Sequence, residues 1–238
     1  MKKITLIIAI AFLIASCGSS RIGQSSPYAD SGYNDSLITQ SLFNDKASTI
    51  NEEGIQKILD GSFKLPAQLR VAIVKLENSQ VRRNYWSYWS DEEYLKTQQS
   101  YLDLFAERFR QSSRVIKLST IPDLLISKTP SFTNIREAAV RMQADIVVVY
   151  SISGDIYSKY KFLSKPDIKA FATTQLIILD VRTGLVPFST IVTKDFLAQK
   201  GKEEINNTEA RNRIQNEAVL MTINEIGQQV TEFLKISK

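Results

Sequence analysis

The chain has 238 residues, of which 30 are Lys or Arg, 25 are Asp or Glu, one is Cys and none is His. Without imidazole or a second thiol, the composition argues against His- and Cys-based catalytic triads, zinc sites and haem ligation. Chemistry based on carboxylates or on a Ser–Lys pair stays open, and we expect no cofactor and no metal. The net charge of +5 is small and its basic residues are scattered, so no nucleic-acid partner is predicted.

The first 16 residues have the features of a secretory signal peptide. Lys2 and Lys3 precede an apolar run over 4–15, which is shorter than the roughly 20 residues of a membrane-spanning helix. The run ends in Ile14-Ala15-Ser16-Cys17, which resembles the lipobox of bacterial lipoproteins, where the thiol accepts a diacylglycerol. We therefore predict a chain that is lipidated at Cys17, carries palmitate and is held at a membrane. The alternatives are an ordinary secretory signal with an incidental Cys, or a buried N-terminal helix.

The residues after Cys17 predict where the anchored chain lies. Gly18 follows the cysteine where an Asp would retain a lipoprotein in the inner membrane, so resemblance to Gram-negative sorting favours the outer membrane with the domain in the periplasm. Surface exposure stays open. Residues 17–46 are rich in Ser, Gly, Asn and Asp, which is typical of a flexible tether. Residues 47–238 are then expected to form one domain.

The first half of this domain alternates predicted helices and strands. A short helix over 48–60 is followed by a strand over 69–76 (LRVAIVKL), whose apolar run indicates burial on both faces. Ser90 and Glu93 form a capping-box pattern that predicts a helix from Ser90 to about Gln111. The apolar stripe of this helix comprises Leu95, Leu102, Phe105 and Phe109.

The second half ends in an antiparallel meander and a long helix. Thr133 is the expected N-cap of a helix over 134–143, and Arg182-Thr183-Gly184 is the expected hairpin turn. The remaining predictions are strands over 115–118, 145–157, 168–181 and 186–199, a helical turn over 122–126 and a helix over 207–234. The order (α)β-α-β-α-β-β-β-α predicts an α/β (α+β) sandwich, in which helices pack on a mixed sheet of about five strands.

Several segments in this order resemble the CsgG-like family of envelope lipoproteins. They are the first strand, the segment FRQSSRVI that leads into the second, AAVRMQADIVVVYSISGDI around the third, and ILDVRTG before the hairpin turn. The resemblance implies a fold related to the N-terminal domain of TolB, and it carries no catalytic residue. The family includes a curli secretion channel, CsgG, and LpoB-type activators of peptidoglycan synthases. The connection Ser158–Lys169 (SKYKFLSKPDIK) is too short and too rich in lysine to insert in a membrane as channel hairpins do.

An aromatic cluster in the loop 81–89 (VRRNYWSYW) is the candidate partner-binding site. Trp and Tyr are enriched in protein interfaces because they bury a large area with few rotatable bonds. The alternative is that these rings pack against the domain itself. The cluster comprises Arg82, Arg83, Tyr85, Trp86, Tyr88 and Trp89.

Together these features predict a membrane-anchored, non-enzymatic protein-interaction module that acts in cell-envelope assembly or secretion. Its partner would be an envelope protein whose identity the sequence does not give, and a homo-oligomer stays open. The first alternative is a subunit of a CsgG-like outer-membrane secretion channel or assembly. The second is a carboxylate-dependent enzyme acting on glycans.

Overall fold

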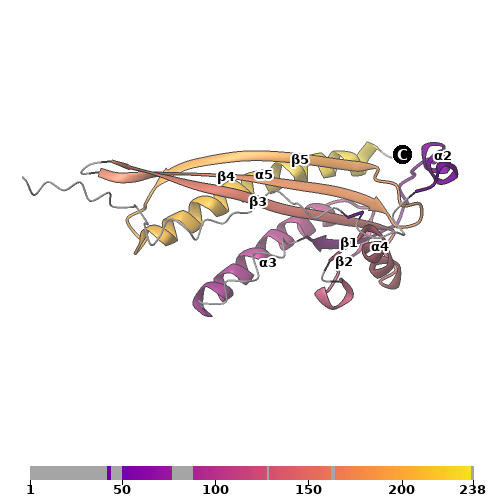
Figure 1. Ribbon diagram of the computed structural model, residues 1–238, viewed down its shortest axis with the longest axis horizontal. Helices are drawn as coiled ribbons and strands as arrows, with labels where there is room; N and C mark the ends of the chain where they lie inside the picture. The colour runs from indigo at the N-terminus through magenta and orange to yellow at the C-terminus, as the bar shows by residue number, and fades with distance from the viewer. Residues whose placement is uncertain (1–41, 44–49, 77–87, 128, 162–163, 237–238) are drawn as a thin grey trace, which may run out of the picture. The chain divides into compact units, whose positions relative to one another are not determined.

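The computed structural model describes residues 42–43, 50–76, 88–127, 129–161 and 164–236. All of them belong to one compact unit, Tyr33–Lys238. The predicted class, a mixed sheet with helices packed on it, is confirmed, and so is the order of elements (Figure 1). The elements are α2 (Glu52–Leu59), β1 (Leu69–Lys75), α3 (Tyr88–Arg110), β2 (Val115–Thr120), the 3-10 turn η3 (Asp123–Leu125), α4 (Phe132–Arg141), β3 (Ile146–Lys161), β4 (Ser164–Asp180), β5 (Phe188–Gln199) and α5 (Asn207–Ile236).

The five strands form one sheet in the order β2-β1-β3-β4-β5. β1 runs parallel to both β2 and β3, because the connections on either side of it carry a helix across the sheet. β3, β4 and β5 are antiparallel, as short hairpin connections require. The predicted burial of the first strand is confirmed, since Leu69 and the run from Val71 to Val74 are buried.

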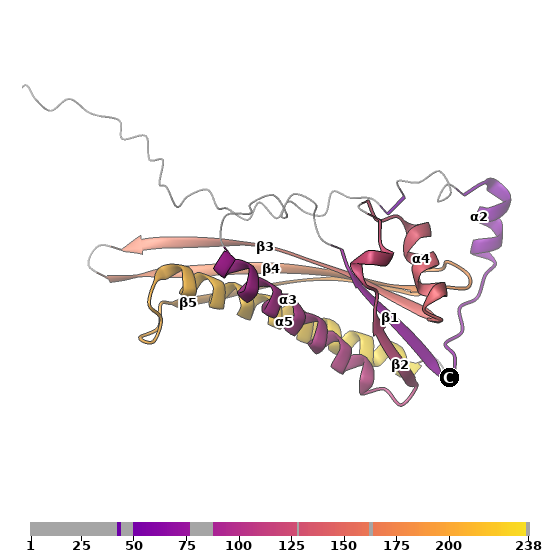
Figure 2. The same cartoon turned by 90° about the horizontal axis from the view of Figure 1, so that it is seen from below.

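Helices cover the two faces of the sheet unequally (Figure 2). α3 and α5 pack on one face, here called the α5 face, where Phe105, Phe109 and Ile214 join the larger apolar core. α4 packs on the opposite face, the α4 face, where Ile135, Ala138 and Ala139 contact the start of β3. Helices therefore cover both faces of the sheet near β1. Farther along the β3–β4 hairpin, the α4 face extends past the end of α4, which does not cover it there.

The hairpin of β3 and β4 extends well past β1, which flanks it on one side, while β5 follows β4 on the other side as far as Asp167. β1 pairs only with Ile146–Tyr150 of β3, while the β3–β4 ladder continues to the pair Lys161 and Ser164. The prediction that Ser158–Lys169 is a connection is therefore wrong, because Ser158 pairs with Ile168 in the ladder. Hydrogen bonding across the ladder holds these residues in strands. The charge of the exposed Lys169 is paired with that of Asp195 at 3.0 Å.

Two glycines are required by the backbone around them. Gly184 has φ +78°, which confirms the turn predicted at this position, since an L side chain rarely adopts that conformation. Gly154, in β3, faces α5 so closely that a Cβ there would lie 2.7 Å from the amide nitrogen of Gln215 and 2.7 Å from the carbonyl oxygen of Phe171. Glycine at this position lets α5 approach the hairpin.

Helix boundaries and helix faces differ from the predictions in three places. α3 begins at Tyr88, so Ser90 lies inside the helix and is not its cap. The cap of α4 is Ser131, whose hydroxyl oxygen accepts from the backbone N–H of Asn134 at 3.2 Å, and Thr133 lies within the first turn. Leu95 is exposed, and the buried stripe of α3 is instead built around Tyr101 and the two phenylalanines. Of these, the buried face of α3 depends on how the helix packs against the rest of the core.

α2 presents apolar side chains that nothing in the described structure buries. The helix is capped by Asn51, whose side chain accepts from the N–H of Gly54 at 2.7 Å. None of its residues is buried, although the pattern predicted an apolar face. Its exposed apolar residues, with the one that precedes it, are Ile50, Ile55, Ile58 and Leu59.

Candidate functional site

The structure describes only part of the predicted binding cluster. Tyr88 and Trp89 are the first residues of α3, so the prediction that they belong to a loop is wrong. The side chains of these two residues lie outside the described part, as do Arg82, Arg83, Tyr85 and Trp86, and also Cys17. A partner-binding role for the aromatic cluster and lipidation of Cys17 therefore both stay predictions.

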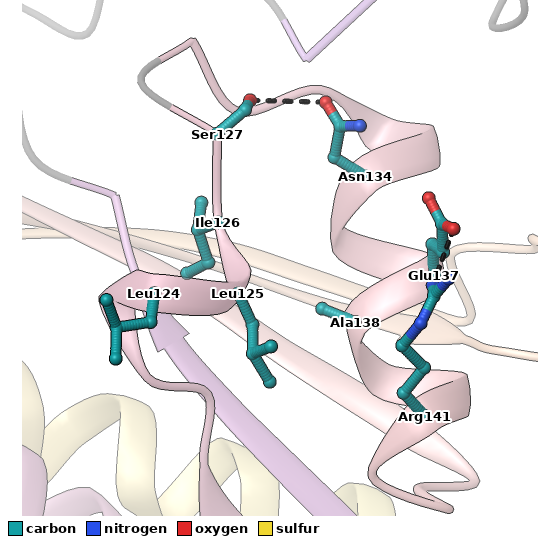
Figure 3. Close-up of a pocket in the computed structure, with 8 residues that line it drawn as sticks. All are labelled: Leu124, Leu125, Ile126, Ser127, Asn134, Glu137, Ala138 and Arg141. Atoms are coloured by element: carbon teal, nitrogen blue, oxygen red, sulfur yellow. Dashed lines mark hydrogen bonds and ion pairs between the residues drawn. The ribbon is translucent and has the colours of Figure 1, made fainter.

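A shallow groove between η3 and α4 is the candidate site among the described residues (Figure 3). Its volume is about 360 Å³. Leu124 and Leu125 from η3 lie on one side and Ala138 from α4 lies on the other. Leu124 is 97 % exposed. The sequence predicted the helical turn over 122–126 but gave no sign that its leucines would face solvent.

The rim of the groove is polar and internally satisfied. The Ser127 hydroxyl donates to the side-chain oxygen of Asn134 at 3.2 Å, and Arg141 forms an ion pair of 2.5 Å with Glu137 one helical turn before it. Because the rim charges pair with each other, no charge is directed at the floor of the groove. The groove therefore suits a partner that inserts an apolar side chain and meets the rim with polar groups.

The position of α4, and with it the groove, is fixed from two directions. At its start, the ring of Phe132 stacks on Phe43 with centroids 5.5 Å apart, and its N–H donates to the carbonyl oxygen of Leu42 at 2.7 Å. At its middle, Arg136 donates to the carbonyl oxygen of Val181 at 3.0 Å, which ties the helix to the β4–β5 turn. The groove is therefore supported by the residues before α2 as well as by the sheet.

Asp145 is the most constrained carboxylate of this region. Its side chain is 7 % exposed and accepts from the Arg70 guanidinium at 2.7 and 3.0 Å and from the Arg70 backbone N–H at 2.9 Å. Hydrogen bonds from the Arg70 side chain hold the pKa of Asp145 below its usual range, against the opposing effect of burial. Every oxygen of this carboxylate is occupied, so Asp145 joins β1 to the start of β3 and is not available as an acid or base.

A second ion pair, between Glu204 and Arg213, joins the loop after β5 to α5. Arg213 donates to Glu204 at 2.5 Å, and this contact holds the pKa of the Glu204 carboxyl below its usual range. Within the residues that the structure describes, no group of three or more His, Cys, Asp or Glu side chains could hold a metal ion. The same residues include no helix with the length and apolarity to cross a bilayer.

Comparison with known proteins gives structural likenesses at low identity. No family model matches the sequence, and no curated protein does. A hypothetical protein from Chlamydia trachomatis is similar over 71 % of this chain and 99 % of its own, with 16 % identity and a TM-score of 0.39. A candidate lipoprotein from Caulobacter crescentus is similar over 71 % of this chain and 92 % of its own, with 8 % identity and a TM-score of 0.40.

A minor lipoprotein from Acinetobacter baumannii is similar over 68 % of this chain and 92 % of its own, with 8 % identity and a TM-score of 0.34. These identities and scores are too low for a function to be transferred from any of the three. Membership of the CsgG-like family therefore stays a prediction from the sequence segments quoted above.

Proposed function

We propose that this chain is a lipoprotein of the bacterial envelope whose domain binds a protein partner and carries out no chemistry of its own. The observation that carries the proposal is the segment Ile14-Ala15-Ser16-Cys17 behind an apolar run of signal-peptide length. Two or more acyl chains on one cysteine suffice for stable anchoring. The tether over 17–46 then sets how far the domain can reach, and Gly18 favours the outer membrane.

Two surfaces are the proposed contact sites for the partner. One is the aromatic cluster of residues 82–89, which supplies large rings beside two arginines. The other is the groove between η3 and α4, which combines an exposed Leu124 with a paired polar rim. Both have the composition of protein interfaces, where apolar anchors are surrounded by satisfied polar groups.

The anchor is tested by the change Cys17→Ala. We expect the variant to lose incorporation of labelled palmitate and to leave the membrane fraction, because the acylated thiol is gone. Ser16→Thr, which keeps the thiol, is the matched control and should stay in the membrane. A Cys17→Ala chain that is retained as fully as the parent would contradict lipid anchoring.

The partner surfaces are tested by photo-crosslinking in cells. A photoreactive residue is placed at Trp86, at Leu124 or, as the control, at Glu107, which is exposed on α3 at the face of the sheet opposite to α4. We expect one envelope protein to be captured from Trp86 or Leu124 and not from Glu107. If no envelope protein is recovered from either site, or the same protein is recovered equally from Glu107, the interaction role is wrong.

A further inference from the structure

The outer edge of β5 is an unusually open strand edge. β5 is the last strand of the sheet, it runs for 12 residues, and its ladder with β4 has no irregularity. The strand contains no Pro. Natural edge strands are commonly protected by Pro, by bulges or by charged side chains, because a bare edge can pair with another strand. β5 has no Pro and no bulge, and its two charged residues, Lys194 and Asp195, are both paired with residues of the same chain.

The direction of the free backbone groups follows from the ladders. The carbonyl oxygen of Tyr150 accepts from Leu76 on the β1 side, so the even residues of β3 point toward β1. Backbone hydrogen-bonding groups alternate in direction along each strand. Across the two antiparallel ladders, this leaves the backbone N–H and C=O groups of the odd-numbered residues of β5 pointing away from the sheet. Of these groups, the Gln199 carbonyl already accepts from Arg213 at 3.1 Å. The outward residues are Ser189, Ile191, Thr193, Asp195, Leu197 and Gln199, and all are exposed.

Two of these outward residues are large and apolar. Ile191 is 68 % exposed and Leu197 is 62 % exposed, and both lie on the α4 face beyond the reach of α4. The one charge in the outward set, Asp195, is neutralised by Lys169 from β4. The outward residues therefore offer backbone donors and acceptors flanked by apolar side chains, and their one charge is paired.

We propose that β5 pairs with β5 of a second copy of this chain, antiparallel about a two-fold axis at Lys194. Of the registers that pair outward residues with each other, this one places Ile191 opposite Leu197 of the partner copy, twice by symmetry. Thr193 then lies opposite Asp195, and Ser189 opposite Gln199, so nearly the whole strand is used. A shift of one pair in either direction places Ile191 opposite Asp195 or Asp195 opposite itself, which loses the apolar match. Self-complementarity of this kind is what an isologous interface requires.

The other layers of the structure are compatible with this pairing. α5 packs on β4 and β5, and strands lie about 4.8 Å apart, so two copies of α5, each centred between these strands, would be separated by roughly 10 Å. Packed helices approach to 8–10 Å, so the two helices would lie at packing distance and not overlap. Lys194 meets its own copy at the axis, and each lysine has the Glu225 carboxylate 3.7 Å away to offset the repulsion.

Disulfide crosslinking of the whole chain, purified in excess detergent, tests the register. We expect Ile191→Cys with Leu197→Cys to give a crosslinked dimer on oxidation, because the paired Cα atoms would lie about 5.5 Å apart. Ile191→Cys with Asp195→Cys is the matched control and belongs to the neighbouring register, so it should not form the disulfide crosslink. The parent, which has only Cys17, sets the background. Equal crosslinking of both pairs, or of neither, would overturn the proposal.

Charge substitution separates pairing from misfolding. Ile191→Lys with Leu197→Lys places like charges opposite each other and should raise the dissociation constant of the dimer at least about tenfold in sedimentation experiments. Ile191→Lys with Leu197→Glu keeps two charged side chains at the same exposed positions and should restore association. A parent chain that sediments as a monomer at all concentrations refutes the pairing, as does a like-charged variant that associates as well as the parent. Neither result bears on the lipid anchor or on the partner.

Discussion

Replacing Gly154 by Ala tests how closely α5 packs on the long hairpin. A Cβ at this position would meet the Phe171 carbonyl oxygen and the Gln215 amide nitrogen, each at 2.7 Å, closer than real Cβ atoms approach. The carbonyl belongs to β4 and cannot rotate away, so β3 or β4 must shift, whereas the Gln215 side chain can move aside. Overpacking of this kind costs about 1–3 kcal/mol, and the loss of glycine's freedom in the unfolded chain offsets about 0.4–1 kcal/mol.

The net expectation is a loss of about 1–2 kcal/mol in the free energy of unfolding. For a domain of this size that corresponds to a fall in Tm of about 2–8 °C, measured by circular dichroism on the purified chain. Gly201→Ala is the matched control, because the Cβ there meets only the flexible side chain of Glu204. We expect its Tm to stay within about 2 °C of the parent.

A second substitution separates the two contacts. Adding Gln215→Ala removes the helical neighbour but leaves the Phe171 carbonyl, so the double variant should recover only part of the lost stability. If Gly154→Ala melts at or above the Tm of the parent, then the Phe171 carbonyl oxygen does not crowd position 154 and glycine is not obligatory there.

Two further predictions concern α4 and the Arg70–Asp145 contact. Ser131→Ala should lower the stability by about 1 kcal/mol because it removes the N-cap of α4, whereas Thr133→Ala should change it by no more than about 0.5 kcal/mol; equal effects in thermal melts would contradict the observed cap. Asp145→Asn should lower Tm most above about pH 5. The pKa of Asp145 is depressed in the folded chain, so the stability that its ionised form contributes is complete above the unfolded pKa of about 3.9 and is lost as pH falls through the folded pKa. Melts across pH should therefore converge between parent and variant in acid, and a constant difference down to the lowest pH would refute this role.

Local causes allowed much of the fold to be predicted. The first strand was predictable because its apolar run suits a position buried on both faces, which β1 occupies. The Thr183-Gly184 turn was predictable because only glycine adopts its positive φ readily. The order of helices and strands followed from such signals taken together.

Much less of the candidate site could be predicted. The exposed Leu124 beside the groove depends on how η3 lies against α4, two segments whose contact no sequence pattern encodes. For the aromatic cluster, the sequence showed the composition but not the secondary structure. Its last two residues were expected in a loop, whereas α3 begins at Tyr88.

The sequence by itself determined the signal-like segment before Cys17, the class of the fold and the turns, because each depends on neighbouring residues. Only the tertiary structure decided the length of the β3–β4 hairpin, the need for Gly154 and the bare edge of β5. A strand continues as long as a partner satisfies its backbone, so lysine-rich residues near 158–169 can be strand despite their polarity. An edge is likewise defined by the strand that is missing beside it, which no local pattern encodes.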